Sequence, residues 1–553
     1  MKTRGLVNGC IVALAMVVSA AGAASPSAKL APAPAAAVER LGTVSFPVSC
    51  APSVQGSVNR GIALLHDFWY EESKPQFERV LQADPSCAMA HWGIAMSSFH
   101  QIWDRPNDAT LAAGWKELQA AQAQPAKTAR EREYIAVLSE FFKPGKDGFE
   151  PRINAYAKAM EQLYAHNPND VDAGAFYALA LLAAVSPNDT SLTQEHKAMA
   201  VLTPLWRKYP DHPGLVHYII HACDTPSLAQ DGLAAARHYG EIAASGPHAV
   251  HMPGHIFARL GMWREDIESN AASVQASHAA EAQHESGWMD QFHSDDFLVY
   301  AYLQSGQEDQ ARAAVAASDA ALSHYEKMPD MTADNYMVGM FPYYRVKLPI
   351  FVALETRDWK SAAALDVGKA STDTSKLLVL WARTIANGHL HQPQPARADL
   401  EAFDTILANM RKGDRAWEAD TTGVKIGRHV MLGWVAFADG KAQDAARHLR
   451  AAADLQDKVG QGEVDIPARE MLGDVLLESG KAAEALVEYK QALKLSPNRF
   501  NALFNAGRAA EGAGNAAEAR GYYAALLKST NNGAHSTRPE LAHAKTFTAT
   551  ASN

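Results

Sequence analysis

The sequence predicts an all-α protein, a solenoid of helical hairpins stacked around a concave groove. The chain has 553 residues, more than one compact core accommodates, so it comprises several domains or an elongated array. Hydrophobic residues make up 48% of the chain and aromatic residues only 8%, and few windows alternate in the manner of a β-strand. In the C-terminal third, small residues recur with a period of 34. Hairpins of that length bury their apolar sides by stacking on one another, which favours the solenoid.

The N-terminal end of the chain is predicted to direct export. Residues 1–24 have the pattern of a signal peptide, with Lys2 and Arg4 at the start, an apolar run over 10–18, and small residues before the cleavage site. Residues 25–44 follow as a Pro/Ala-rich tether with too little apolar surface to fold. The mature protein is therefore expected to be periplasmic or secreted.

The charge balance argues against two classes of partner. The formal net charge of -10 is spread over mixed-sign segments, with no basic stripe for nucleic acid and no polybasic patch for a membrane surface. Beyond the signal segment, no stretch approaches the roughly 18 uninterrupted apolar residues of a membrane span. We therefore expect neither a nucleic-acid partner nor a membrane-spanning helix.

Three cysteines remain in the mature chain, in an oxidising compartment if export is correct. A disulfide between Cys50 and Cys87 is the favoured pairing, and three buried, unpaired thiols are the alternative. Cys223 lies beside a histidine cluster, where it is either a ligand or, more in keeping with its size, a small buried residue.

The clearest repeats lie in residues 421–528. Two successive units place small residues and a tyrosine at matching offsets, and a third unit around Gly433 fits the same frame. The matching positions are Leu472, Gly473, Gly480, Ala485 and Tyr489, then Ala506, Gly507, Gly514, Ala519 and Tyr523. This pattern resembles the tetratricopeptide repeat, in which small residues let helices A and B of a hairpin cross closely.

The same repeat pattern, applied to the rest of the chain, predicts its domain boundaries. Degenerate repeats are expected at 45–210, histidine-rich repeats at 211–320 and further degenerate helical repeats at 321–420, whereas 529–553 is expected to be a disordered tail. Loops or insertions over the groove are expected at three Pro/Gly-containing segments: 143–151, 328–342 and 388–397.

Histidines cluster in the segment PHAVHMPGHIFARLGMW, residues 247–263. Gly254 fits the small-residue position eight of a repeat, and Gly261 fits the turn position fifteen. In tetratricopeptide repeats, positions two, five, nine and thirteen of helix A face the groove, so the resemblance implies that four side chains point at a ligand. These are His248, His251, His255 and Arg259.

The two neighbouring helices extend this set. His217 and His221 lie at i and i+4, so one helical face presents both imidazoles. The same register on the following helix selects three more residues: His293, Asp296 and Tyr300. Three consecutive A helices are therefore expected to turn these side chains towards one spot.

Three interpretations of the cluster stay open. The six histidines suit a transition metal such as zinc, copper or iron, because imidazole and carboxylate groups are ligands for these ions. Alternatively, they line a metal-free groove for a peptide or a small polar ligand, or they are satisfied groups packed in the interior. Pro253 bears on the geometry, since a helix that starts at Met252 or Pro253 would disturb the i,i+4 relation of His251 and His255.

A further histidine falls in the first repeat. His66 occupies position thirteen and is expected to look into the N-terminal groove, with the acids Asp67, Glu71 and Glu72 nearby. A charged junction between a helix and its turn explains these acids equally well.

Longer segments resemble a group of exported bacterial tetratricopeptide-repeat proteins. HYIIHACDTP at 217–226 and HMPGHIFARLGMW at 251–263 carry this resemblance in the centre, and the matches extend over about 45–528. The resemblance implies a fold and a shared surface, without a specific activity.

Two hypotheses of function follow. The first is a binding or scaffold protein that captures a peptide, a protein partner, a small polar ligand or a metal in the groove. The alternative is a metal-dependent enzyme built on the same histidines, with Asp296, Tyr300 and Arg259 as candidates for proton transfer or charge stabilisation. HMPGH lacks the glutamate of the H-E-x-x-H metalloprotease motif, so that class is excluded.

Overall fold

The computed structural model describes most of the chain after its N-terminal segment. It covers residues 39–102, 105–124, 126–145, 148–186, 189–287, 290–328, 336–413, 416–460, 462 and 464–549, with 336–339 described by their backbone. The predicted signal peptide and residues 25–38 of the predicted tether lie outside the described residues. Across the described residues helix follows helix and no β-strand occurs, so the prediction of an all-α helical solenoid is confirmed.

The end of the predicted tether is packed against the helices, contrary to expectation. The backbone amides of Gly42 and Thr43 donate to the carbonyl oxygens of Ile242 and Asp211 at 2.9 and 2.8 Å. The side chain of Leu41 is buried. This segment pairs its backbone with distant helix ends, a relation that local composition does not reveal.

The first helices form antiparallel hairpins whose starts are fixed by polar caps. Thr128 and Glu131 make a capping box, and the side chains of Asn107 and Asp170 cap two other helices. The elements are η1 (Pro52–Val54), α1 (Gln55–His66), α2 (Tyr70–Ala83), α3 (Ala88–Met96), α4 (Asp108–Ala123), α5 (Ala129–Phe142), α6 (Phe149–His166), α7 (Val171–Ala183) and α8 (Thr193–Trp206).

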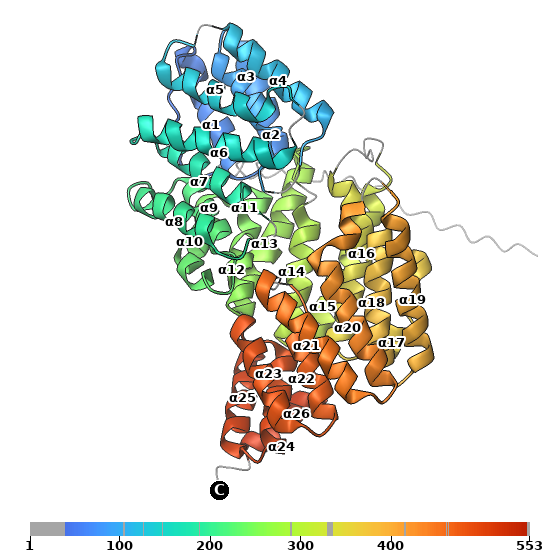
Figure 1. Cartoon of the computed structure of the whole chain (residues 1–553). Coiled ribbons are helices and arrows are strands. Elements are labelled where there is room, and N and C mark those ends of the chain that lie inside the picture. The colour runs from blue at the N-terminus through green and yellow to red at the C-terminus, as the bar shows by residue number, and fades with distance from the viewer. Residues whose placement is uncertain are drawn as a thin grey trace, which may run out of the picture. The chain divides into compact units, whose positions relative to one another are not determined.

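The central helices carry the histidine-rich segments and occupy the green part of the colour scale (Figure 1). They are α9 (Pro213–Cys223), α10 (Ala229–Ile242), α11 (Pro247–His251), α12 (Pro253–Arg259), α13 (Trp263–Ala282), α14 (Asp290–Gln304) and α15 (Glu308–Tyr325). Three of them, α9, α11 and α12, begin with proline, whose missing N–H costs nothing in the first turn.

The C-terminal helices confirm the close crossing that the small residues predict. A Cβ atom added at Gly473 would lie 2.7 Å from the ring of Tyr489, and one at Gly507 would lie 2.4 Å from the ring of Tyr523. The elements are α16 (Tyr336–Glu355), α17 (Trp359–Ala363), η2 (Val367–Lys369), α18 (Asp373–His389), α19 (Pro393–Met410), η3 (Ala416–Asp420), α20 (Thr422–Ala438), α21 (Ala442–Val459), α22 (Ala468–Glu478), α23 (Ala482–Leu495), α24 (Phe500–Gly512), α25 (Ala516–Ser529), η4 (Asn531–Gly533) and α26 (Pro539–Ala549).

Two predictions about irregular segments are wrong. Residues 388–397 are mostly helical, because α19 starts on Pro393 only a few residues after α18 ends. The predicted disordered tail, 529–553, contains α26, whose Leu541 and Ala544 are buried. A terminal helix of this kind covers the apolar face that the last repeat would otherwise expose. No helix within the described ranges has the length and apolar character needed to cross a membrane.

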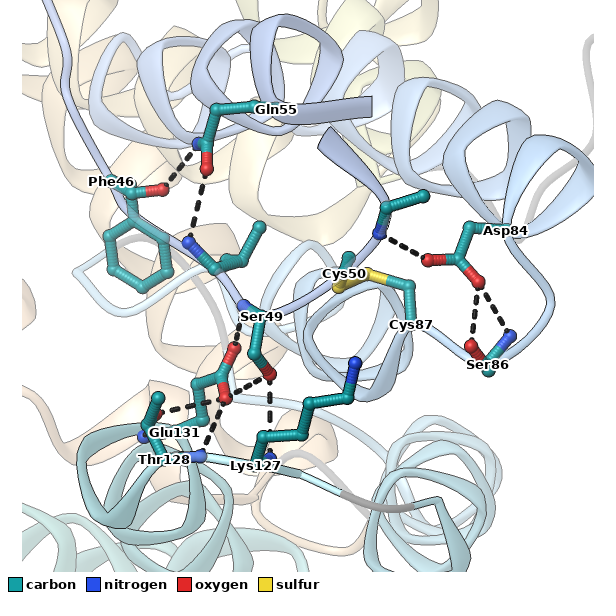
Figure 2. The surroundings of a disulfide bond; sticks show 12 residues. Phe46, Ser49, Cys50, Gln55, Asp84, Ser86, Cys87, Lys127, Thr128 and Glu131 are labelled. Atoms are coloured by element: carbon teal, nitrogen blue, oxygen red, sulfur yellow. Dashed lines mark hydrogen bonds between the residues drawn. A yellow bond between two sulfur atoms is a disulfide. The ribbon is translucent and has the colours of Figure 1, made fainter. Parts of the chain in front are cut away.

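The predicted disulfide between Cys50 and Cys87 is present and ties the segment before α1 to the start of α3 (Figure 2). Hydrogen bonds surround it. The amide of Ala51 donates to the carboxylate of Asp84 at 2.7 Å, and the amide and hydroxyl of Ser49 donate to the carboxylate of Glu131, each at 2.5 Å. These contacts hold the N-terminal segment against α2, α3 and α5.

The apolar core divides within α12. One cluster of buried hydrophobic residues runs from Phe46 to Phe257, and a second begins at Ala258 and runs to Ala544. The histidine-rich segments therefore lie where the two clusters meet, and α12 packs on both α9 and α14 there. Polar side chains between two apolar clusters need hydrogen-bond partners within the protein, because burying an imidazole without a hydrogen bond costs free energy.

Candidate metal centre

Helix α9 presents its two histidines to one point. The Nε2 atoms of His217 and His221 lie 3.0 Å apart, as their i,i+4 spacing predicts. His217 is fully buried, and its Nδ1 lies 2.5 Å from the carbonyl oxygen of His66. Because a carbonyl oxygen only accepts, this Nδ1 carries the proton and the Nε2 lone pair of His217 faces His221.

His248 on α11 completes a first triad with this pair. One ring nitrogen from each of His217, His221 and His248 lies within 4.8 Å of the other two. Burial lowers the pKa of His217 to about 3, and burial together with the neighbouring imidazoles lowers the pKa of His248 well below its usual value. Both rings are therefore neutral at neutral pH, the state in which imidazole binds a metal.

The segment around Pro253 keeps His251 and His255 together, which corrects the expectation that the proline would disturb them. Helix α11 ends at His251 and α12 begins at Pro253, but Met252 between them has helical torsion angles, φ -51° and ψ -37°. The chain direction continues through the proline, and the amide of His255 donates to the carbonyl oxygen of Met252 at 3.2 Å. The Nε2 atoms of His251 and His255 consequently lie 3.0 Å apart.

Both rings of this pair have their other nitrogen engaged by an oxygen. The Nδ1 of His251 lies 2.6 Å from the Oδ1 of Asn270, whose own amide nitrogen donates to Asp266 at 2.7 Å. The Nδ1 of His255 lies 3.0 Å from the carboxylate of Asp224. Both Nδ1 atoms therefore donate, so in the neutral rings both Nε2 atoms present lone pairs to each other.

His293 on α14 joins this pair to form a second triad. Its ring centroid is 4.4 Å from that of His251 and 5.6 Å from that of His255, and the three residues each offer a nitrogen within 4.8 Å of the others. His293 comes from a separate helix, so the triad depends on tertiary packing of α11 and α14.

The spacing within each pair fits one shared ion. Two nitrogens bound to a tetrahedral zinc at roughly 2.0–2.1 Å lie roughly 3.3 Å from each other, close to the 3.0 Å seen in both pairs. Hydrogen bonds from Nδ1 to a carbonyl or carboxylate fix the tautomer and orientation of the ring, as around many metal sites. The residues present therefore fit a transition metal.

Each triad is packed against one phenylalanine that sequence analysis did not select. The ring of Phe68 lies 4.4, 5.4 and 5.6 Å from those of His217, His221 and His248. Phe297 lies 4.9, 4.8 and 5.3 Å from the rings of the second triad. The i,i+4 relation of His293 and Phe297 was readable in the sequence, whereas Phe68 lies too far away along the chain.

Burial distinguishes this cluster from the open groove wall that the sequence predicts. His217, His248 and His251 are buried, and His221, His255 and His293 are half-buried. The six rings also form one continuous set, because His248 and His251 bring the two triads to a centroid distance of 6.1 Å. The site is an interior cluster in which three of the six rings are half-buried.

Three predicted site residues are engaged in other contacts. Arg259 donates from Nε to the carboxylate of Asp224 at 2.9 Å, the same carboxylate that His255 of the second triad contacts. Asp296 is paired with Lys347 of α16. Tyr300 donates to the backbone carbonyl of Asp465 at 2.9 Å and accepts a hydrogen bond from Arg499.

Different partners explain the last two differences. His293 and Phe297 share the stripe that faces α11 and α12, as their ring contacts show. Asp296 instead contacts Lys347 of α16, and Tyr300 contacts Arg499 at the start of α24. The prediction that His293, Asp296 and Tyr300 point to one spot is therefore wrong.

His66 belongs to a separate buried network rather than to an N-terminal groove. Its Nε2 lies 3.0 Å from the carboxylate of Asp172, which also contacts His212 at 3.2 Å, and its Nδ1 lies 2.9 Å from the hydroxyl of Tyr218. A Cβ atom at Gly214 would lie 2.3 Å from this ring. Each nitrogen of His66 already has a partner in a tightly packed site, which indicates a structural network.

Cys223 is unpaired and buried, with its sulfur 3.6 Å from that of Met199. Burial raises the pKa of its thiol to about 12, so it is protonated at neutral pH. Both observations favour the role of a small buried residue.

Comparison with known proteins defines the repeat type. Residues 470–534 match the family model of the tetratricopeptide repeat, over a region that contains α23, α24 and α25. The chain thus carries tetratricopeptide repeats at the place where its 34-residue period is clearest. Repeats of this type indicate a protein-binding scaffold.

The wider comparisons give distant similarities. No curated protein matches the chain. A crystal structure of a tetratricopeptide repeat protein from Parabacteroides merdae aligns at 14% identity and a TM-score of 0.28, covering 55% of this chain and 99% of that one. The human IFIT1 dimer with PPP-AAAA aligns at 13% identity and a TM-score of 0.34, covering 85% of this chain and 88% of that one.

Proposed function

We propose that this protein is an exported helical-repeat scaffold that binds a transition metal at the six histidines of α9, α11, α12 and α14. One observation carries the proposal. The Nε2 atoms of His251 and His255 face each other at 3.0 Å while both Nδ1 atoms are bonded to oxygens. Two lone pairs at that distance repel unless a proton or a metal ion lies between them, and a metal ion is bound by imidazole pairs of this kind.

The surroundings of the cluster support metal binding in two further ways. Burial keeps His217 and His248 neutral, so a metal does not have to displace protons from them at neutral pH. Imidazole nitrogens suit zinc, copper and iron. When bound, such an ion would be held by ring nitrogens of the triads, and Asn270 and Asp224 would orient those rings.

Export and a protein partner complete the proposal. The signal-peptide pattern of residues 1–24 and the disulfide between Cys50 and Cys87 both suit a periplasmic or secreted protein. The C-terminal tetratricopeptide repeats support a peptide or protein partner. Arg259, Asp296 and Tyr300 are all engaged in ion pairs or hydrogen bonds, which favours the binding hypothesis over a metal-dependent enzyme.

Elemental analysis of untagged, stripped and reloaded protein tests the proposal. After equilibration with zinc and removal of excess ion, the parent protein is expected to retain zinc stoichiometrically. The double variant His221→Ala/His255→Ala removes one half-buried ring from each triad and is expected to lose it.

A matched control separates the cluster from another pair of half-buried histidines. His429 and His448 also lie close together, with their Nδ1 atoms 3.4 Å apart, but outside the cluster. The variant His429→Ala/His448→Ala is expected to retain zinc as the parent does. If the parent holds no zinc, copper or iron after reloading, the proposal is wrong.

A further inference from the structure

We infer that the cluster is a dinuclear centre, in which each triad holds its own copper ion and the two ions are neighbours. This inference rests on the proposed function, since it specifies how many ions the same residues hold and of which kind. The first triad is His217, His221 and His248, and the second is His251, His255 and His293.

The two triads are built in the same way, which argues for two equivalent pockets. Each takes an i,i+4 pair from one helical segment, with the two Nε2 atoms 3.0 Å apart. Each adds a third imidazole from the next A helix, His248 for the first pair and His293 for the second. Three nitrogens leave a fourth position open on a four-coordinate ion.

The shared segment of α11 and α12 sets the distance between the pockets. His248 and His251 belong to different triads and are three residues apart on one continuous helical path. At a rise of about 1.5 Å per residue, this separates their backbones by roughly 4.5 Å along the axis. Their ring centroids are 6.1 Å apart, so the two pockets share a wall made by these two imidazoles.

The packing around the rings repeats as well. Phe68 contacts all three rings of the first triad, and Phe297 contacts all three rings of the second. Both phenylalanines are buried. One apolar ring behind each set of three imidazoles limits the movement of the ligands and excludes water from that side.

The backbone at Phe68 is strained in a way that supports this role. Its φ is +56°, at the turn between α1 and α2. Other turns of the chain use glycine in that conformation: Gly261, Gly306, Gly440, Gly480 and Gly514. A bulky residue with positive φ costs of order 1–3 kcal/mol and persists where its side chain is needed. Arg357 and His391 also adopt a positive φ in two further turns, so this conformation occurs in turns away from the triads as well.

The ligand type favours copper over the other first-row ions. The triads consist of imidazoles, and the carboxylate of Asp224 contacts His255 through Nδ1 and Arg259 through Nε. Nitrogen sites bind divalent copper more tightly than zinc, iron or manganese, and an imidazole-only set adds no carboxylate to favour the harder ions.

Copper titration of stripped, full-length mature protein, followed by desalting and elemental analysis, tests this inference. The parent protein is expected to retain two copper ions per chain. His221→Ala and His293→Ala each remove one half-buried ligand from a single triad, and each variant is expected to retain one ion. The variant with both substitutions is expected to retain none, and His429→Ala/His448→Ala is expected to retain two.

The possible results separate the inference from the proposed function. One ion in the parent protein, or loss of all copper in either single variant, would show one shared site: the inference would be wrong and the proposed function would stand. No copper, zinc or iron in the parent would overturn both. Should a variant fail to fold, the electron paramagnetic resonance spectrum of the copper-loaded parent decides. Interacting copper ions are expected, and a spectrum of isolated copper ions alone would contradict the inference.

Discussion

The backbone carbonyl oxygen of His66 lies 2.5 Å from the Nδ1 of His217. This contact joins the end of α1 to the first triad, although the two residues are 151 positions apart. The next turn residue, Asp67, accepts a hydrogen bond from the buried hydroxyl of Tyr239 at 2.8 Å, and Phe68 then packs on the triad. The turn after α1 is therefore part of the structure that orients His217.

Replacing Phe68 tests the role of this turn. Phe68→Ala is expected to lower the free energy of unfolding by about 3–5 kcal/mol, because it empties a buried aromatic site. Phe68→Gly removes the same ring but relieves the positive φ, so it is expected to be less destabilising than Phe68→Ala by roughly 1 kcal/mol. Urea unfolding of the metal-free variants measures both. An alanine variant more stable than the glycine variant would show that the turn is not strained.

Asp224 is expected to tune metal affinity without being a ligand. Its carboxylate accepts from the Nδ1 of His255 at 3.0 Å, and Asp224→Asn weakens that acceptor. Loss of such a partner typically costs 10–100-fold in metal affinity. Competition with a chelator of known affinity measures the change. The control Asp404→Asn breaks an exposed ion pair with Arg428 and is expected to leave the affinity unchanged. Equal affinities in the two variants would contradict this role.

The N-terminal segment is expected to make stability depend on pH on the acid side. Burial acts to raise the pKa of Glu131, but the hydrogen bonds from Ser49 and Thr128 outweigh it and hold the pKa below its usual 4.5. The folded state therefore binds fewer protons than the unfolded state below about pH 4.5. This contribution to the free energy of unfolding is complete above that pH and is lost as the pH falls further.

The variant Glu131→Gln measures that contribution. It loses a charged acceptor for the amide and hydroxyl of Ser49, so it is expected to be roughly 2–4 kcal/mol less stable than the parent at pH 7. The difference is expected to shrink towards pH 3. Urea unfolding at several pH values gives both curves, and a constant difference over that range would rule out the assigned cause.

The disulfide between Cys50 and Cys87 is expected to add about 3–4 kcal/mol to the free energy of unfolding. The two residues are 37 positions apart, and a cross-link over a loop of that length reduces the entropy of the unfolded chain. The double variant Cys50→Ser/Cys87→Ser is expected to unfold at lower denaturant concentration. Reductant is expected to lower the denaturant concentration at which the parent unfolds towards that of the variant, and to leave the value for the variant unchanged. A reductant-insensitive parent would contradict the prediction.

Local spacing predicts what lies within one helical hairpin. The small residues at Gly473 and Gly507 predict close helix crossing, and the i,i+4 spacing predicts the pairing of His217 with His221. His251 and His255 also pair, because Met252 keeps helical torsion angles beside Pro253.

Relations between distant segments could not be predicted in this way. The His66 carbonyl reaches the first triad across 151 residues and the Phe68 ring comes from the same turn, and no local pattern encodes that approach. Asp296 and Tyr300 of α14 contact Lys347 and Arg499, which come from later parts of the chain, and the register of a single repeat does not reveal these partners. The packing of Leu41 and of α26 depends likewise on partners elsewhere in the chain.

X-ray absorption spectroscopy of the zinc-loaded protein tests the central claim most directly, because it reports the atoms bound to the ion. We expect a first shell dominated by nitrogen at roughly 2.0–2.1 Å, with the outer-shell scattering of about three imidazole rings per ion. In His221→Ala/His255→Ala, that imidazole scattering is expected to disappear. A first shell of oxygen without imidazole scattering in the parent protein would contradict metal binding by the histidine triads.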